Sequence, residues 1–391
     1  MSDPWLTILG IGEDGAAGLS EASRAALAAA KVIVGPPRHL ALIPEASAER
    51  VEWPVPFADG LDLLESFRGR PTVALASGDP FRHGAGAAIA RRFEPHEWTC
   101  HPAPSAFALA AARLGWAEES CVCAALHAAP LERLVPDLAT GVRVIATLRD
   151  GGAAAALAAW LTGRGWGAST LTLLERLGGP SERVRTVRAE QGAPDCDHPL
   201  MAAIEVAGNG TVVPHASGRP DALFETDGQI TKRPVRALAL SALAPRPGEI
   251  LWDVGAGSGS VGIEWLLSHS SLNAVAVEAR ADRAARIACN AATLGVERLR
   301  VVEGRAPEAL MDLPAPDAVF VGGGLSEALL DALPGARVVA HAVTLESEAL
   351  LTRIHAERGG SLLRVELSAP APLGPKRGWR AAYPVTQWSW P

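Results

Sequence analysis

The chain has 391 residues, of which 48% are hydrophobic and 20% charged, and its formal net charge at pH 7 is −7. This length exceeds what one hydrophobic core usually supports, so we expect two or more domains, and the composition excludes a globally disordered chain. The acidic balance argues against a protein that binds nucleic acid, because such proteins usually carry a basic surplus.

The cysteines and the apolar runs indicate the cellular compartment of the protein. Five scattered cysteines are typical of a reducing cytosol, and none stands at a zinc-ligand spacing, so we expect no metal site. There is no run of about 18 apolar residues and no secretory signal pattern at the N-terminus. We therefore expect a cytoplasmic protein with no membrane partner. The cysteines are Cys100, Cys121, Cys123, Cys196 and Cys289.

The first half of the chain alternates apolar strands with helices. Such alternation predicts an α/β fold with a mainly parallel sheet, and ligands at the carboxyl ends of its strands. Ser20 is suited to cap the first helix. The predicted strands are 5–10, 31–34, 71–76 and 142–148, and the predicted helices are 20–30 and 103–114.

The stretch AGNGTVVPHASGRPD, which begins at residue 207, is rich in Gly and Pro and is typical of a domain linker. We therefore predict one domain at 1–208 and a second at 209–391. The second domain repeats the alternation of strands and helices. Near its end, we predict that residues 362–367 and the stretch PVTQWSW form antiparallel edge strands. The other predicted strands are 250–254, 274–278, 299–303 and 317–321, and the helices are 261–268 and 281–294.

The run LWDVGAGSGSVGIEW at 251–265 is a strand that breaks into a glycine loop and then a helix. Glycines at this place let backbone N–H groups approach a ligand at the positive end of a helix. A dinucleotide signature can be framed from Gly257, but that frame starts two residues after the turn that follows Val254. A plain tight turn is the third reading.

Two carboxylates bear on which ligand the loop holds. Asp253 stands at the strand end, where it would repel a pyrophosphate and attract the amino group of S-adenosylmethionine. Glu278, at the end of the next strand, is placed to accept both ribose hydroxyls, which NAD and S-adenosylmethionine share. Asp253 and the loop frame therefore favour S-adenosylmethionine, and Glu278 does not discriminate.

From residue 224 onward the chain resembles the C-terminal, class I Rossmann-like methyltransferase half of the precorrin-6Y C5,15-methyltransferase (decarboxylating) family. The stretches that carry the resemblance are FETDGQITKRPVRALALSALAPRPGEILWDVGAGSGSVGIEW, VAVEAR, GRAPEAL, VFVGGG, AVTLESEALL and PVTQW. The resemblance implies an S-adenosylmethionine pocket formed by Thr231, Gly255, Ala256, Gly257, Ser258, Gly259, Glu278, Arg305 and Ala306.

Residues 5–206 resemble the tetrapyrrole (corrin/porphyrin) methylase family, in LGIGEDG, VGPPRHL, ASGDPFRHGAG, HPAPSAFALAAARLGW and LLERLGGPSERV. In that family S-adenosylmethionine lies folded in a cleft between two α/β subdomains. The resemblance implies contacts from Gly10, Asp79, Arg82 (through its main chain), Ser105 and Ala106.

The residues themselves leave other readings open in this half. Asp79 also suits a turn or a helix N-cap, and Ser105 a plain N-cap, which is compatible with a binding role. We expect His127 to be structural, because no partner carboxylate stands at a useful spacing.

The two resemblances imply a bifunctional enzyme of cobalamin biosynthesis that methylates carbons 5 and 15 of a precorrin and decarboxylates its ring C acetate. They assign carbon 5 to the N-terminal half and the other two steps to the C-terminal half. The substrate carries many carboxylates, and TKRPVR supplies Lys232, Arg233 and Arg236 as candidates to hold them. A solvated basic helix start is the alternative for this stretch.

Two other functions stay open from the sequence. An RNA methyltransferase is one, which the acidic balance and the lack of basic–aromatic clusters oppose. A non-catalytic tetrapyrrole carrier with a vestigial loop is the other. We expect a homo-oligomer, since relatives of both halves self-associate.

Overall fold

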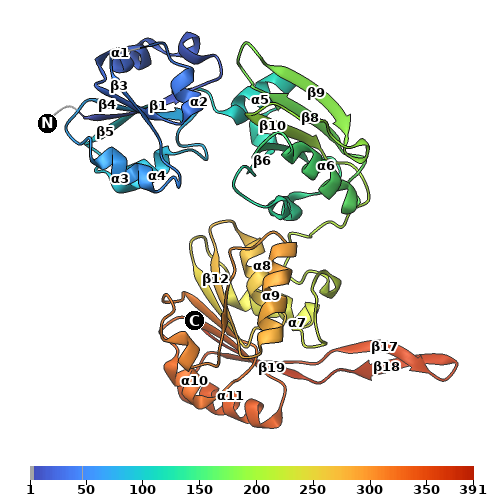
Figure 1. The fold of residues 1–391 in the computed structure, drawn as a ribbon. Helices are drawn as coiled ribbons and strands as arrows, with labels where there is room; N and C mark the ends of the chain where they lie inside the picture. The colour runs from blue at the N-terminus through green and yellow to red at the C-terminus, as the bar shows by residue number, and fades with distance from the viewer. Residues whose placement is uncertain (1–3, 46) are drawn as a thin grey trace. The chain divides into compact units, whose positions relative to one another are not determined.

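The structure is a computed structural model that describes residues 4–45 and 47–391. The chain forms two compact units, residues 1–131 with 137–211 and residues 212–391 with 132–136 (Figure 1). The Gly- and Pro-rich stretch that begins at residue 207 contains the start of the second unit. No helix in the described part of the chain is both long enough and apolar enough to cross a membrane.

The described residues of the first unit form two sheets of five strands. The first has the order β3-β2-β4-β1-β5 and its neighbours are all parallel. The second has the order β6-β7-β10-β8-β9, in which only β6 and β7 pair in parallel. The expected mainly parallel sheet is therefore wrong for this second sheet. No α-helix separates β8, β9 and β10 in sequence, and short connections join antiparallel strands.

The elements of the first unit follow the expected alternation at most of the predicted positions. Its strands are β1 (Leu6–Ile11), β2 (Val32–Gly35), β3 (Glu49–Glu52), β4 (Thr72–Ser77), β5 (Trp98–His101), β6 (Val122–Ala125), β7 (Arg143–Leu148), β8 (Thr170–Glu175), β9 (Arg183–Arg188) and β10 (Leu200–Glu205). Its helices are α1 (Glu21–Ala29), α2 (Pro37–Ala41), α3 (Asp59–Glu65), α4 (Gly86–Arg92), α5 (Ala106–Leu114) and α6 (Ala153–Gly163).

Helices cover both faces of the first sheet because its strands are apolar on both sides. Leu6 and Ile8 pack with α3 and α4, whereas Leu9 and Ile11 pack with α1 and α2. On the second sheet, α5 inserts Phe107 and Ala110 against strands β7, β8 and β10. Each sheet is thus the centre of one subdomain of the first unit.

The second unit is built on one sheet with the order β13-β12-β11-β14-β15-β19-β16. Strands β11 to β15 are parallel, and β19 is antiparallel to both of its neighbours. The prediction that PVTQWSW forms an edge strand is wrong, because β19 lies between β15 and β16, and the edge strands of this sheet are β16 and β13. A hairpin of β17 and β18 projects from this unit (Figure 1).

The strands of the second unit are β11 (Ile250–Val254), β12 (Asn273–Glu278), β13 (Arg300–Glu303), β14 (Ala318–Val321), β15 (Arg337–Ala342), β16 (Ser361–Val365), β17 (Ser368–Leu373), β18 (Lys376–Ala381) and β19 (Val385–Trp390). Its helices are α7 (Arg233–Leu243), α8 (Ser260–Ser268), α9 (Ala281–Thr293), α10 (Glu327–Ala332) and α11 (Leu345–Arg358).

Strand alternation divides the core of the second unit between the two faces of the sheet. Trp252 and Val254 pack with Leu329 of α10 and Leu351 of α11. Helices α7, α8 and α9 cover the opposite face (Figure 1). The carboxyl ends of β11 to β15 consequently meet at one edge of the sheet, which is where α/β proteins place their ligands.

Candidate functional site

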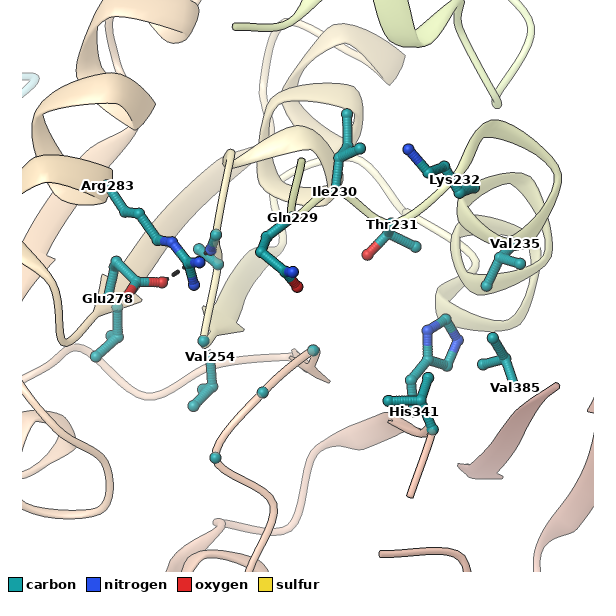
Figure 2. Close-up of a pocket in the computed structure, with 18 of the residues that line it drawn as sticks. Gln229, Ile230, Thr231, Lys232, Val235, Val254, Glu278, Arg283, His341 and Val385 are labelled. Carbon is teal, nitrogen blue, oxygen red and sulfur yellow. Dashed lines mark hydrogen bonds between the residues drawn. The ribbon is translucent and has the colours of Figure 1, made fainter. Parts of the chain in front are cut away.

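A cavity of about 570 Å³ opens at the carboxyl edge of the second unit's sheet. Its size is within the range of small-molecule sites. Figure 2 shows Glu278 on one side of it, His341 and Val385 on the other, and the segment Gln229–Lys232 along a third side. The cavity therefore lies between the carboxyl ends of β11 and β12 on one side and the carboxyl end of β15 with the start of β19 on the other.

The glycine loop after β11 forms the floor of this cavity. Gly255 has φ 66°, and a Cβ on it would stand 2.7 Å from the backbone of Gly323, so only glycine fits there. Gly255, Ala256 and Gly257 line the cavity. Gly259 instead faces Ile287 of α9, at 2.7 Å from the position of a Cβ, and Ser258 is buried and also outside the lining. The structure thus brings only the first three residues of the predicted loop to the cavity.

Glu278 ends β12 with its carboxylate fixed by the backbone. One oxygen accepts a hydrogen bond from the N–H of Gly257 at 2.9 Å, and the other from the N–H of Arg280 at 3.1 Å. The side chain is 6% exposed and lines the cavity. Each carboxylate oxygen retains a lone pair for a further donor, which suits two neighbouring hydroxyls.

Asp253 does not line the cavity, contrary to the sequence prediction. Strand alternation turns its side chain toward α8, where one oxygen accepts the N–H of Gly262 at 2.8 Å and the other has no partner. Burial raises the pKa of Asp253 to about 7, with Glu278 adding to the rise and the hydrogen bond opposing it. The contact expected between Asp253 and an amino group of the ligand is not formed by this geometry.

The predicted substrate cation Arg236 is a structural residue. It is fully buried and pairs with Glu264 at 2.6 Å and with Asp221 at 3.0 Å. Glu264 is also fully buried and accepts the backbone N–H groups of Gly218 and Arg219. A buried cation with these partners is not available to a substrate, so the prediction for Arg236 is wrong.

The other predicted residues of the TKRPVR stretch differ in whether they reach the cavity. Thr231 and Lys232 line the cavity, whereas Arg233 is exposed and outside the lining. Arg236 donates to the carbonyl oxygen of Thr231, so the buried cluster holds this stretch along the cavity. Arg305 and Ala306, for which the family resemblance implied a binding role, also line the cavity.

Sequence reasoning missed several residues of this cavity. His341 is the penultimate residue of β15, a strand that was not predicted although VVAHA is a short apolar run of the expected kind. Tyr383 is 87% exposed at the cavity, in the chain just before β19. Gly322 to Gly324, the GGG after β14, also line the cavity. They belong to a stretch that carries the family resemblance, but no role was predicted for them. Position at the carboxyl end of a parallel strand was the signal available for His341 and for the three glycines.

The first unit has its own cavity, of about 260 Å³. Its walls come from the loops after β1 and β4, from the start of α5, from the last residues of β7 and from the first residues of β10. It therefore lies between the two subdomains of that unit, each contributing one wall.

Four of the five residues predicted for this half line the cavity: Asp79, Arg82, Ser105 and Ala106. Asp79 accepts the N–H of Phe81 at 2.9 Å, a turn contact. Ser105 caps α5 by accepting the N–H of Ala108 at 3.1 Å. The structural readings of both residues are thus confirmed, and they leave a binding role open.

Gly10 lies beneath the cavity rather than on its wall. A Cβ on it would stand 1.9 Å from the carbonyl oxygen of Gly78 and 2.6 Å from the backbone nitrogen of Ala103. The side chain of Arg82 is engaged with Glu118 at 3.1 Å and with the ring of Phe107. These contacts occupy its side chain, which is compatible with the predicted contact through its main chain.

Three histidines of this cavity were not predicted for it. His127, which we expected to be structural, lines it and pairs through Nδ1 with the hydroxyl of Thr147 at 2.9 Å. His83 and His198 also line it, and burial lowers the pKa of each. The three come from segments far apart in the chain, which sequence spacing does not reveal.

Comparison with known proteins covers both units. Residues 6–192 match the family of tetrapyrrole (corrin/porphyrin) methylases, and residues 222–391 match the precorrin methyltransferase domain. A precorrin-6Y C(5,15)-methyltransferase [decarboxylating] of Sinorhizobium sp. is 49% identical over 99% of this chain and 96% of its own. One of Mycobacterium tuberculosis is 43% identical over 98% of this chain and 99% of its own.

A crystal structure of the C-terminal domain of precorrin-6Y C5,15-methyltransferase from Rhodobacter capsulatus covers 45% of this chain and 98% of its own. Its sequence identity is 55% and its TM-score 0.44.

The fold and the two matched families define a methyltransferase enzyme made of a tetrapyrrole methylase unit followed by a precorrin methyltransferase unit. With relatives this similar over nearly the whole chain, the protein belongs to the precorrin-6Y C5,15-methyltransferase (decarboxylating) family.

Proposed function

We propose that the protein converts precorrin-6Y to precorrin-8 in cobalamin biosynthesis, with S-adenosylmethionine as methyl donor at two separate sites. Residues 1–208 methylate carbon 5, and residues 209–391 methylate carbon 15 and decarboxylate the ring C acetate. The observation that carries this proposal is that each unit has its own cavity, lined by residues that its own family resemblance predicted for the donor.

The residues of the second unit fit the proposed donor. The carboxylate of Glu278 faces the cavity with lone pairs left for both ribose hydroxyls. Because Gly255 has no side chain, the turn presents only backbone to the cavity at this point. In the first unit, Gly10 and Gly78 allow two backbone segments to approach closely below the cavity.

When bound, S-adenosylmethionine supplies an electrophilic methyl group with a good leaving group. The chain's own residues then have to align donor and acceptor and exclude water, and this chemistry requires no metal. Strands β11 and β12 present the glycine turn and Glu278 to the cavity, and the segment that precedes α7 presents Thr231 on another side.

Two cations of the second cavity are available for substrate carboxylates. Lys232 and Arg305 both line it, and neither forms an ion pair with another residue of the described chain, 4–45 and 47–391. The third cation on its wall, Arg283, is already paired with Asp227 at 2.9 Å. Charge-assisted bonds from Lys232 and Arg305 would orient the macrocycle rather than merely attract it.

The test is to incubate the full chain with precorrin-6Y and isotopically labelled donor, and to analyse the product by mass spectrometry. We expect two labelled methyl groups and one carbon dioxide per product. A ratio of one methyl group per product, or a product that keeps all its carboxylates, would refute the proposal. A carrier without catalytic activity would return the substrate unchanged.

A further inference from the structure

His341 occupies the side of the second cavity opposite Glu278 (Figure 2). It is the penultimate residue of β15, where it pairs in register with Gln387 of β19. Its Nε2 lies 2.9 Å from Oε1 of Gln387, and the ring of Phe320 meets it edge to face at 5.0 Å. The imidazole is therefore held by neighbours on two strands.

The hydrogen bond to Gln387 indicates which nitrogen carries the proton. Oε1 of Gln387 is an acceptor, so Nε2 of His341 must donate, and the lone pair of a neutral ring is then on Nδ1. Burial lowers the pKa of His341, and the hydrogen bond to Gln387 opposes that shift only in part. The ring is accordingly neutral at pH 7, with one nitrogen free to accept a proton.

The reaction proposed for this unit moves one proton between two carbons. Methylation of carbon 15 forms a carbon–carbon bond, breaks the carbon–sulfur bond of the donor and releases the proton that carbon 15 held. Decarboxylation breaks the bond to the ring C carboxylate, and the electron pair stays with the methylene carbon, which gains a proton and becomes a methyl group. The sulfonium charge and the carboxylate charge cancel, so no proton is released or consumed overall.

We propose that His341 transfers this proton: it takes the proton from carbon 15 on Nδ1 and delivers it to the methylene carbon left by decarboxylation. The inference rests on the proposed function. Carbon 15 is bonded to ring C, so both carbons lie on one side of the macrocycle. One imidazole opposite the glycine turn and Glu278 serves both positions and ends in its starting state.

The other groups of the cavity are less suited to this role. Lys232 and Arg305 carry charges that the substrate carboxylates would hold. Tyr383 is 87% exposed, so its hydroxyl exchanges with solvent. His341 combines partial burial with a fixed tautomer, which is what a proton carrier between two carbons requires.

The test uses the full chain, in which carbon 5 methylation serves as an internal reference. In His341→Gln we expect carbon 15 methylation and carbon dioxide release to fall together by about 100-fold or more, with carbon 5 methylation unchanged. Added imidazole restores both steps in His341→Ala. The matched control is His269→Gln, which changes a histidine after α8 that pairs with Ser271 and lies outside the cavity.

Two further measurements separate proton transfer from a structural role. Nitrogen NMR of the full chain without substrate should show His341 neutral at pH 7 with its proton on Nε2. Gln387→Glu places a carboxylate beside the ring and raises its pKa, so the pH profile of the carbon 15 step moves up by about one unit while that of carbon 5 does not.

Three results would overturn the inference. One is a His341→Gln enzyme that keeps carbon 15 methylation within threefold of the unmodified chain. Another is a loss of calorimetric donor binding in that variant together with no rescue of His341→Ala by imidazole, which assigns the residue a structural role. The third is an unmoved pH profile in Gln387→Glu. Failure of the proposed function differs, because the unmodified chain itself would then make no doubly methylated product.

Discussion

The two cavities are built by different means, and the difference decides how a sequence encodes each. In the second unit, the parallel strands of one sheet have their carboxyl ends at the same edge. The residues that follow β11, β12 and β13 therefore lie close together as a direct result of the strand arrangement. In the first unit, segments of two subdomains line the cavity, and they come from residues between 11 and 201. The site of the second unit therefore depends on local rules, and the site of the first unit depends on how two subdomains pack.

The largest effect we expect tests whether the two sites are separate. In Glu278→Gln, one acceptor oxygen becomes an NH₂ group, while two backbone N–H groups and two ribose hydroxyls still require acceptors. Donor affinity in the second unit should fall by about 100-fold. Calorimetry should then detect one donor site per chain instead of two.

Glu303→Gln is the matched control for that variant. Glu303 ends β13 and is the register partner of Glu278, yet it is exposed and does not line the cavity. We expect both donor sites to keep their affinity. Two sites of unchanged affinity in Glu278→Gln would contradict the assignment of Glu278.

The next effect concerns stability and is confined to the second unit. Glu264→Gln removes the buried carboxylate that pairs with Arg236 and Arg219, so Arg219 loses this ion pair and Arg236 keeps only the one with Asp221. The free energy of unfolding of the second unit should fall by about 3–5 kcal/mol, as for other buried pairs that lose one partner. In a calorimetric scan, the transition of the first unit should not move.

Glu327→Gln is the control for this stability effect, because Glu327 pairs with Arg353 at 2.9 Å on the exposed surface of the same unit. Surface pairs contribute little, so neither transition should shift. A shift as large as that of Glu264→Gln would mean that burial does not set the contribution of these pairs.

Particular residues show which parts of the fold and of the two sites the sequence could predict. Strand β11 was predicted at its observed bounds, because a run of apolar residues ending in glycine has few alternatives. Arg236 was assigned wrongly, because nothing local shows that Glu264 lies buried beneath it, 28 positions along the chain. His127, His83 and His198 meet only through packing of two subdomains, which no spacing encodes.

A pH effect should also distinguish the units. The pKa of Asp253 is raised from 3.8 to about 7, so between these values the folded protein keeps a proton that the unfolded chain has lost. Unfolding then releases a proton, and the stability of the second unit falls as pH rises through this window. Asp253→Asn still accepts from Gly262 and removes this dependence, stabilising the unit at pH 8 by on the order of a few kcal/mol.

Thermal scans of the full chain between pH 4 and pH 8 measure this, with the transition of the first unit as the reference. A second-unit transition with the same pH dependence in the variant would show that Asp253 is charged in the folded state.

The smallest effect separates capping from binding in the first unit. Ser105 caps α5 and Ser20 caps α1, each by accepting a backbone N–H at 3.1 Å, but only Ser105 lines the cavity. Each Ser→Ala change should therefore cost about 1 kcal/mol of stability in the same unit. Only Ser105→Ala should also weaken donor binding there, by about fivefold, the equivalent of one hydrogen bond. Equal donor affinity in the two variants would leave Ser105 with a capping role alone, and would place the donor in the first unit against Asp79 and the loop after β4 instead.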